Sequence, residues 1–202
     1  WVDPKIKVYW NNYKIPIKTF EDYVKLYIGN QSMVYEKLDD YWELGVTYSN
    51  DDEFDQVSFV NGINTLRGGK HVDYIVDQIK SKLTTIIKKK RKITIKPTYV
   101  KNQLFLFLKS TIVNPAFDSQ TKEFLKTTKG KFGFKPEISN KFIDKVYKTD
   151  IVEKIISLAS YKDNKDLKKT DGRKRTKLRI PKLDDANKAG GKYSKECTLI
   201  LT

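Results

Sequence analysis

Alternation of apolar and polar residues dominates the first part of the chain and predicts short β-strands. Runs 5–9 and 14–17 alternate on either side of an Asn-Asn pair, which indicates a hairpin. Three further strands are predicted at 33–37, 41–48 and 56–61. The clean alternation within 41–48 is typical of an antiparallel strand with one buried face. We therefore expect a sheet in this part of the chain.

A short helix is predicted between the hairpin and the next strand. Thr19 is a candidate N-cap, and Asp22 places a carboxylate where it faces the first helical amides. Gly29 and Asn30 supply the helix stop. The apolar residues that recur at helical spacing are Phe20, Tyr23, Val24 and Tyr27.

A longer helix is predicted over about residues 71–87, because one apolar stripe begins at Val72 and continues to Ile87. The run Leu104–Leu108 that follows is continuously apolar, as in a central strand covered on both faces. The path from strand 56–61 through the helix to this run has the length of a βαβ crossover. We therefore predict an α+β fold, in which a mixed sheet of about four strands packs against a long helix.

The last part of the chain predicts two more helices and a charged segment. Ser139 is a candidate cap for a helix that ends near Tyr147, and Asp150 is a candidate cap for the next one. Residues 161–179 are highly charged, which favours a mobile linker. The apolar run 198–201 predicts a final strand.

The composition allows a packed domain and gives it a strong positive charge. Hydrophobic residues make up 39% of the 202 positions, and 40 basic against 25 acidic residues give a formal net charge of +15. Such a field favours a polyanionic partner, nucleic acid first and an anionic membrane surface second. Solubility demands or an AT-rich genome are the alternative source of the charge, since the chain is rich in Lys, Asn, Ile and Tyr.

Several classes of site are excluded or are not indicated. With one cysteine, Cys197, and one histidine, the chain forms neither an internal disulfide nor a Cys/His zinc site. No apolar run has the length of a membrane span, and no signal peptide is visible. His71 is interpreted as a helix-start or surface histidine, because no spacing gives it a nucleophile or a carboxylate partner. Asp184 and Asp185 are interpreted as solvated loop residues, so no metal site is assigned.

The loop Asn114–Lys126, which follows the apolar run, offers candidate phosphate-binding chemistry. It reads N-P-A-F-D-S-Q-T-K-E-F-L-K, and Pro115 stiffens its entry. Its tip presents the amide of Gln120 and the ammonium of Lys122. An amide is a directional donor and an ammonium is a compact point charge, so the pair suits a phosphate oxygen. A solvated surface loop is the alternative, and it is the commoner outcome for three such residues alone.

Five consecutive cations stand at the end of the predicted long helix. They are Lys88, Lys89, Lys90, Arg91 and Lys92. A cationic C-terminus complements the helix dipole, but one or two cations suffice for that. The excess is expected to stay solvated unless an anion docks, and we predict sequence-independent contacts with DNA phosphates.

Three stretches of the chain resemble eukaryotic-type DNA topoisomerase II, in the same order and with similar spacing. N-P-A-F-D-S-Q-T-K-E at 114–123 resembles the Q-T-K loop of that family. V-S-F-V-N-G-I-N-T-L-R-G-G-K-H-V-D-Y-I-V-D-Q at 57–78 is similar to its transducer segment. P-K-L-D-D-A-N-K-A-G-G-K-Y-S-K-E-C-T-L-I-L-T at 181–202 resembles the lead-in to its Toprim domain. The resemblance covers nearly the whole chain.

The resemblance implies four parts and a longer parent polypeptide. Residues 1–30 would end an ATPase domain, and 31–138 would form a transducer domain similar in fold to the second domain of a ribosomal protein. Residues 139–180 would be stalk helices and a basic linker, and 181–202 the start of the Toprim domain. The nucleotide-binding core, the Toprim metal ligands and the DNA-attacking tyrosine would lie outside the chain. The fragment is therefore expected to be inactive alone and to bind no cofactor by itself.

The resemblance also implies a function for the parent. It would be a nuclear, homodimeric type II DNA topoisomerase that uses ATP and magnesium to pass one DNA duplex through another. Lys122 and Gln120 would bind the terminal phosphate of ATP held by the ATPase domain of the same chain. The family also carries a lysine-rich loop near DNA, at the position of Lys88–Lys92. The transducer would relay ATP binding and hydrolysis to the DNA gate.

A function of another class remains as an alternative. A basic α+β nucleic-acid-binding module without nucleotide coupling would explain the net charge and the aromatic content. It would not explain why a polar Q-T-K tip follows a buried strand. Fold alone does not separate the two, because one fold serves many functions.

Overall fold

A five-stranded mixed sheet forms the centre of the fold. Its strands are β3 (Val34–Lys37), β4 (Trp42–Tyr48), β5 (Asp55–Val60), β6 (Ile63–Asn64) and β7 (Leu104–Ser110). They lie in the order β3-β4-β7-β5-β6, with β5 and β7 parallel and the other pairs antiparallel. The predicted α+β class is confirmed, with one strand more than expected, because the short β6 folds back onto β5.

The computed structural model describes residues 5–170 and 192–197, and their side chains up to 162 and from 192. The chain divides after Ala159 into two units, and the sheet and the candidate site described below lie in the first of them. No helix within the described residues is long and apolar enough to cross a membrane.

Two helices connect the parallel strands β5 and β7. These are α2 (Lys70–Arg91) and α3 (Pro97–Asn102), so the predicted crossover is present. The long helix continues past its predicted end and includes four residues of the basic run. It ends where Lys92 takes a left-handed backbone conformation, with φ of 60°. The six-residue α3 was not predicted, because it is too short to show a helical period.

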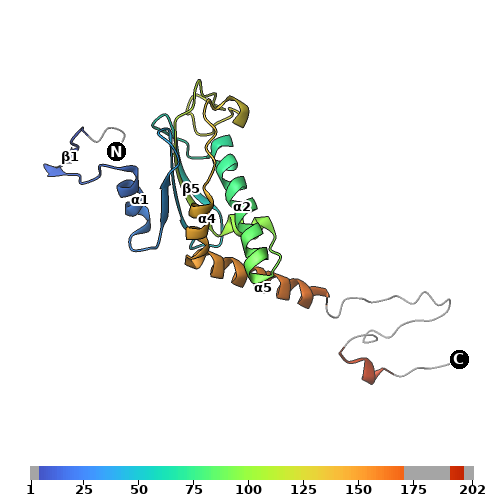
Figure 1. Ribbon diagram of the computed structural model, residues 1–202. Coiled ribbons are helices and arrows are strands. Elements are labelled where there is room, and N and C mark those ends of the chain that lie inside the picture. The colour runs from blue at the N-terminus through green and yellow to red at the C-terminus, as the bar shows by residue number, and fades with distance from the viewer. Residues whose placement is uncertain (1–4, 171–191, 198–202) are drawn as a thin grey trace. The chain divides into compact units, whose positions relative to one another are not determined.

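Both faces of the sheet are covered, and β7 shows this along its length. Leu104 and Leu108 are fully buried in the core that contains α2 and α4 (Asn140–Tyr147). Phe107 is fully buried on the opposite face, where it packs with α1 (Phe20–Ile28). Figure 1 shows α1 on one side of the sheet and α2 with α4 on the other. The continuously apolar run therefore forms a doubly covered central strand, as predicted.

The predicted N-terminal hairpin is present but short. It pairs β1 (Tyr9–Trp10) with β2 (Tyr13–Lys14). Asn11 and Asn12 make its turn with φ of 46° and 63°, the left-handed values that a tight hairpin needs.

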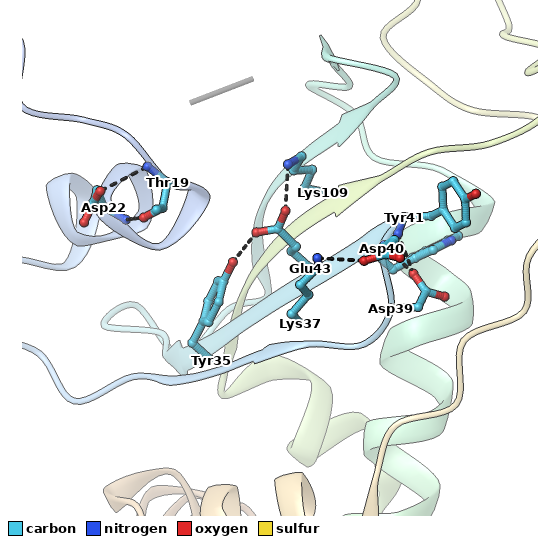
Figure 2. Close-up of polar contacts among 10 residues, drawn as sticks. Thr19, Asp22, Tyr35, Lys37, Asp39, Asp40, Tyr41, Glu43 and Lys109 are labelled. Atoms are coloured by element: carbon cyan, nitrogen blue, oxygen red, sulfur yellow. Dashed lines mark hydrogen bonds and ion pairs between the residues drawn. The ribbon is translucent and has the colours of Figure 1, made fainter. Parts of the chain in front are cut away.

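Helix α1 begins with the expected cap. The Asp22 amide donates to Thr19 Oγ1 at 3.1 Å, and the Thr19 amide donates to Asp22 Oδ2 at 3.0 Å (Figure 2). This capping box satisfies two amides that the helix leaves free. Hydrogen bonding with Thr19, and then with the Lys18 amide, lowers the pKa of the Asp22 carboxyl. Phe20 and Val24 are buried as expected, whereas Tyr27 is half exposed.

A polar cluster crosses three strands of the sheet. The Tyr35 hydroxyl donates to Glu43, and Lys109 Nζ lies 2.6 Å from Glu43 Oε1 (Figure 2). The Lys109 and Glu43 side chains are 27% and 17% exposed, so the carboxylate is paired where water reaches it poorly. Burial, and then the hydrogen bond with Glu43, raises the pKa of Tyr35.

The C-terminal helices agree with the prediction in place but not in every boundary. A 3₁₀ turn, η1 (Lys129–Lys131), precedes α4, and Ser139 caps α4 by accepting from the Phe142 amide at 3.0 Å. Helix α5 is Asp150–Thr170, so Asp150 lies inside its first turn rather than capping it.

The prediction of a mobile linker over 161–179 is wrong up to Thr170. No glycine or proline interrupts this stretch, so α5 continues through it. The rest of the linker, Asp184 with Asp185, and the expected strand 198–201 lie outside the described residues. A second 3₁₀ turn, η2, is Ser194–Glu196.

Candidate functional site

The loop after β7 forms a narrow hairpin that carries the predicted tip. Phe117 and Leu125 form a β-bridge, and the Asp118 amide donates to the Phe124 carbonyl at 3.1 Å. Two residues closer to the base of the hairpin, the Lys126 amide donates to the Ala116 carbonyl at 2.8 Å. We call residues 117–125 the tip loop. The two limbs at its base, which we call the stem, are joined by backbone hydrogen bonds. These bonds restrict the conformation of the tip.

The tip brings the two predicted phosphate-binding groups together on one turn. Gln120 and Lys122 are both exposed. The Lys122 amide donates to the Ser119 carbonyl at 3.2 Å, and Lys122 has a left-handed φ of 59°. Gln120 and Lys122 therefore lie two residues apart on one closed and exposed turn, where an amide and an ammonium are both open to an anion.

The tip loop docks on the first turn of α2 through Gly68 and Gly69. The Leu125 amide donates to the Gly68 carbonyl at 3.1 Å, and the Lys70 amide donates to the Leu125 carbonyl at 3.0 Å. Gly69 and Leu125 thus form a parallel bridge. The sequence indicated only a turn at this glycine pair, because a docking partner distant in sequence leaves no local signal. The bridge joins the tip loop directly to the long helix.

His71 is part of this junction and is buried, so the prediction of a surface position is wrong. Its Nε2 lies 3.3 Å from Thr65 Oγ1, which in turn lies 2.5 Å from Ser58 Oγ. The side chain is fully buried beside β5 and β6, and burial lowers its pKa to about 3. The imidazole is therefore neutral at physiological pH and serves packing. The helix-start position that the sequence indicated is confirmed.

The basic run divides into two groups at the other end of α2. Lys90 Nζ lies 3.2 Å from Asp144 Oδ1 of α4, and Arg91 Nη2 lies 2.5 Å from Glu153 Oε1 of α5. Both side chains are exposed, as expected for the whole run, but each is also paired with a carboxylate of the same chain, which was not predicted. Their partners come from distant helices, which the local sequence does not reveal.

The other three cations of the run, for which the structure gives no ion pair among the described residues, lie exposed on the last turn and cap of α2. They are Lys88, Lys89 and Lys92. The helix between them and Gly69 has 22 residues, which corresponds to about 33 Å. The two predicted binding groups therefore lie at opposite ends of one helix.

Comparison with known proteins identifies the family to which the chain belongs. The profile of the family described as DNA gyrase B matches residues 12–175. The chain belongs to this family. It is 47% identical over 207 residues to DNA topoisomerase 2 of Arabidopsis thaliana, and the match covers 98% of the chain and 14% of the plant protein. The resemblance to eukaryotic-type DNA topoisomerase II is thereby confirmed, and the chain spans a small part of such proteins.

Two solved structures of DNA topoisomerase II share the fold at 40% sequence identity. The ATPase and transducer domains of the Balamuthia mandrillaris enzyme superpose with a TM-score of 0.73, covering 81% of this chain and 42% of that one. The ATPase region of the Saccharomyces cerevisiae enzyme gives 0.70, covering 77% and 40%. The predicted transducer-type fold is confirmed by this likeness.

Proposed function

We propose that the chain is the transducer region of an ATP-dependent type II DNA topoisomerase. In this role it relays ATP binding and hydrolysis in the preceding ATPase domain to the DNA gate. The observation that supports this most is the docking of the tip loop on α2. The bridge between Gly69 and Leu125 joins the exposed cationic tip to α2, and the far end of α2 is paired with α4 and α5.

The tip has the chemistry to contact the terminal phosphate of ATP in the neighbouring domain. Lys122 supplies a compact positive charge, and Gln120 supplies a directional donor. Because the stem is hydrogen-bonded, these groups are oriented before the phosphate arrives, which makes an electrostatic contact effective. The remaining nucleotide contacts and the magnesium ion belong to other parts of the parent enzyme.

The opposite end of α2 has contacts that would pass a movement on. Lys90 and Arg91 join its last turn to Asp144 and Glu153. When Lys122 loses its phosphate contact, the tip loop, α2 and the sheet would rotate as one body and carry the stalk helices with them. Lys88, Lys89 and Lys92 would bind DNA phosphates without reading sequence. The parent would act as a nuclear homodimer.

The ATPase rate of the full-length parent with Lys122→Ala tests this proposal. We expect turnover to fall by on the order of a hundredfold, because one charge-stabilising donor is lost. Lys129→Ala is the matched control, since it removes an exposed lysine from η1 without touching the tip. Near-normal turnover in the Lys122 variant would remove the phosphate-contact role.

A basic nucleic-acid-binding module is the second candidate, favoured by the three exposed cations at the end of α2. In that case Lys122→Ala would leave ATP turnover unchanged, while loss of Lys88 and Lys89 would still weaken DNA binding. The presence of a nucleotide-binding domain upstream of Trp1 in the parent sequence would favour the relay instead.

A further inference from the structure

A chain of polar side chains links the segment before α2 to the tip. Arg67 Nη1 lies 3.1 Å from Asp118 Oδ2, and the Asp118 side chain is 17% exposed. Ser119 Oγ donates to Asp118 Oδ1 at 3.2 Å and lies 2.8 Å from Thr121 Oγ1. Both oxygens of the Asp118 carboxylate therefore have a partner. One oxygen faces a cation outside the loop, and the other faces the turn that carries the phosphate-binding groups.

Arg67 holds both limbs of the tip loop. Its guanidinium contacts Asp118 on the outgoing limb, and its backbone amide donates to the Glu123 carbonyl on the returning limb at 3.0 Å. The next residue, Gly68, accepts from the Leu125 amide. The stem is thus fixed at three successive points from the same outside segment, and Arg67 provides the two that lie nearest the tip.

We propose that Arg67 and Asp118 are positioning residues, whose ion pair sets the direction in which Gln120 and Lys122 point. This inference rests on the proposed function. Because the Arg67 side chain is 66% exposed, the pair contributes only modestly to global stability. The rate of ATP hydrolysis should depend more strongly on the orientation of Gln120 and Lys122. A misplacement of about 1 Å in a reacting geometry can reduce rates by on the order of a hundredfold. The pair would therefore affect ATP turnover far more than folding.

The test compares Arg67→Ala, Asp118→Ala and the exchanged pair Arg67→Asp with Asp118→Arg in the full-length parent. We expect each alanine variant to lower kcat for ATP hydrolysis about tenfold, with a melting temperature close to that of the wild type. The exchanged pair should recover part of the loss, because it restores the attraction but not the hydrogen bond from Ser119 Oγ. Lys37→Ala is the matched control, since it removes the exposed pair between Lys37 and Asp40 elsewhere on the same domain.

Each outcome separates this inference from the proposed function. If Lys122→Ala lowers turnover while both alanine variants keep wild-type kcat, the positioning role is wrong and the proposed function stands. If Lys122→Ala itself keeps normal turnover, the proposed function is wrong. Amide hydrogen exchange of residues 117–125 then decides the positioning role: faster exchange in Arg67→Ala supports it, and unchanged exchange overturns it. If kcat falls and the exchanged pair recovers none of it, the same exchange measurement decides, because arginine at position 118 cannot accept from Ser119 Oγ.

Discussion

Gly69 and Leu125 approach so closely that no side chain fits between them. A Cβ atom placed on Gly69 would lie 2.5 Å from the Leu125 nitrogen and 2.6 Å from its carbonyl oxygen. Gly69 also has a φ of 142°, in the region that favours glycine. The close approach permits the hydrogen bonds that join the tip loop to α2. In the proposed relay, Gly69 would thus be the point at which a movement of the tip reaches the helix.

Replacing Gly69 by alanine should separate the tip loop from α2. We expect a loss of on the order of 3 kcal/mol in unfolding free energy, from backbone strain together with a steric clash. In the full-length parent, ATP turnover should fall as well, because the stem no longer holds the tip. Urea unfolding and steady-state ATPase rates measure the two effects.

Gly62→Ala is the control for this prediction. Gly62 also has a positive φ, 82°, but nothing lies within 4 Å of the position where its Cβ would be. This variant should cost about 1 kcal/mol from strain alone and leave turnover unchanged. If both variants lose the same stability and activity, the contact with Leu125 has no special role.

The parts of the fold that the sequence predicted are those with a local or periodic signal. The doubly buried strand was evident from Leu104–Leu108, and the cap of α1 from Thr19 with Asp22. The partners of Gly69 and of Lys90 were not predictable, because tertiary packing brings them from distant segments. His71 was misplaced for the same reason, since its burial depends on how β6 folds back over the helix start.

Lowering the pH should destabilise the chain through His71. Burial lowers the pKa of His71 to about 3, while in the unfolded chain it keeps its ordinary value of 6.5. The unfolded state therefore takes up a proton first, so stability is full above pH 6.5 and falls as the pH drops toward 3. Between pH 7 and pH 5 the unfolding free energy should fall by about 2 kcal/mol. Urea unfolding at the two pH values measures the difference.

The chain contains a single histidine, so few other groups titrate in that window. His71→Gln should flatten the dependence between pH 7 and pH 5, whatever its absolute stability. Thr65→Val is the matched control: it removes the hydroxyl next to Nε2 but keeps the titrating ring, so the slope should persist. A His71→Gln variant with an unchanged slope would show that another group is responsible.

Neutralising the two groups of the basic run should have different effects. Changing Lys88, Lys89 and Lys92 to glutamine should weaken DNA binding and reduce the slope of log affinity against log salt by up to about three, because three phosphate contacts are lost. The melting temperature should not change. Changing Lys90 and Arg91 should lower the melting temperature modestly, since both are paired with other helices. Fluorescence anisotropy with a short duplex across a salt series measures the first effect.

The effect of removing three positive charges must be distinguished from the effect of where those charges lie. The chain offers a control for this. Lys126, Lys129 and Lys131 are also exposed, and their replacement by glutamine removes the same three charges near the opposite end of the domain. Salt dependence reports phosphates neutralised at the contact surface, whereas long-range attraction depends on the whole field. The Lys88 group should therefore reduce the slope more than this control does. If both sets of substitutions reduce the salt slope equally, the DNA contact lies elsewhere. The basic run would then only complement the dipole at the end of α2.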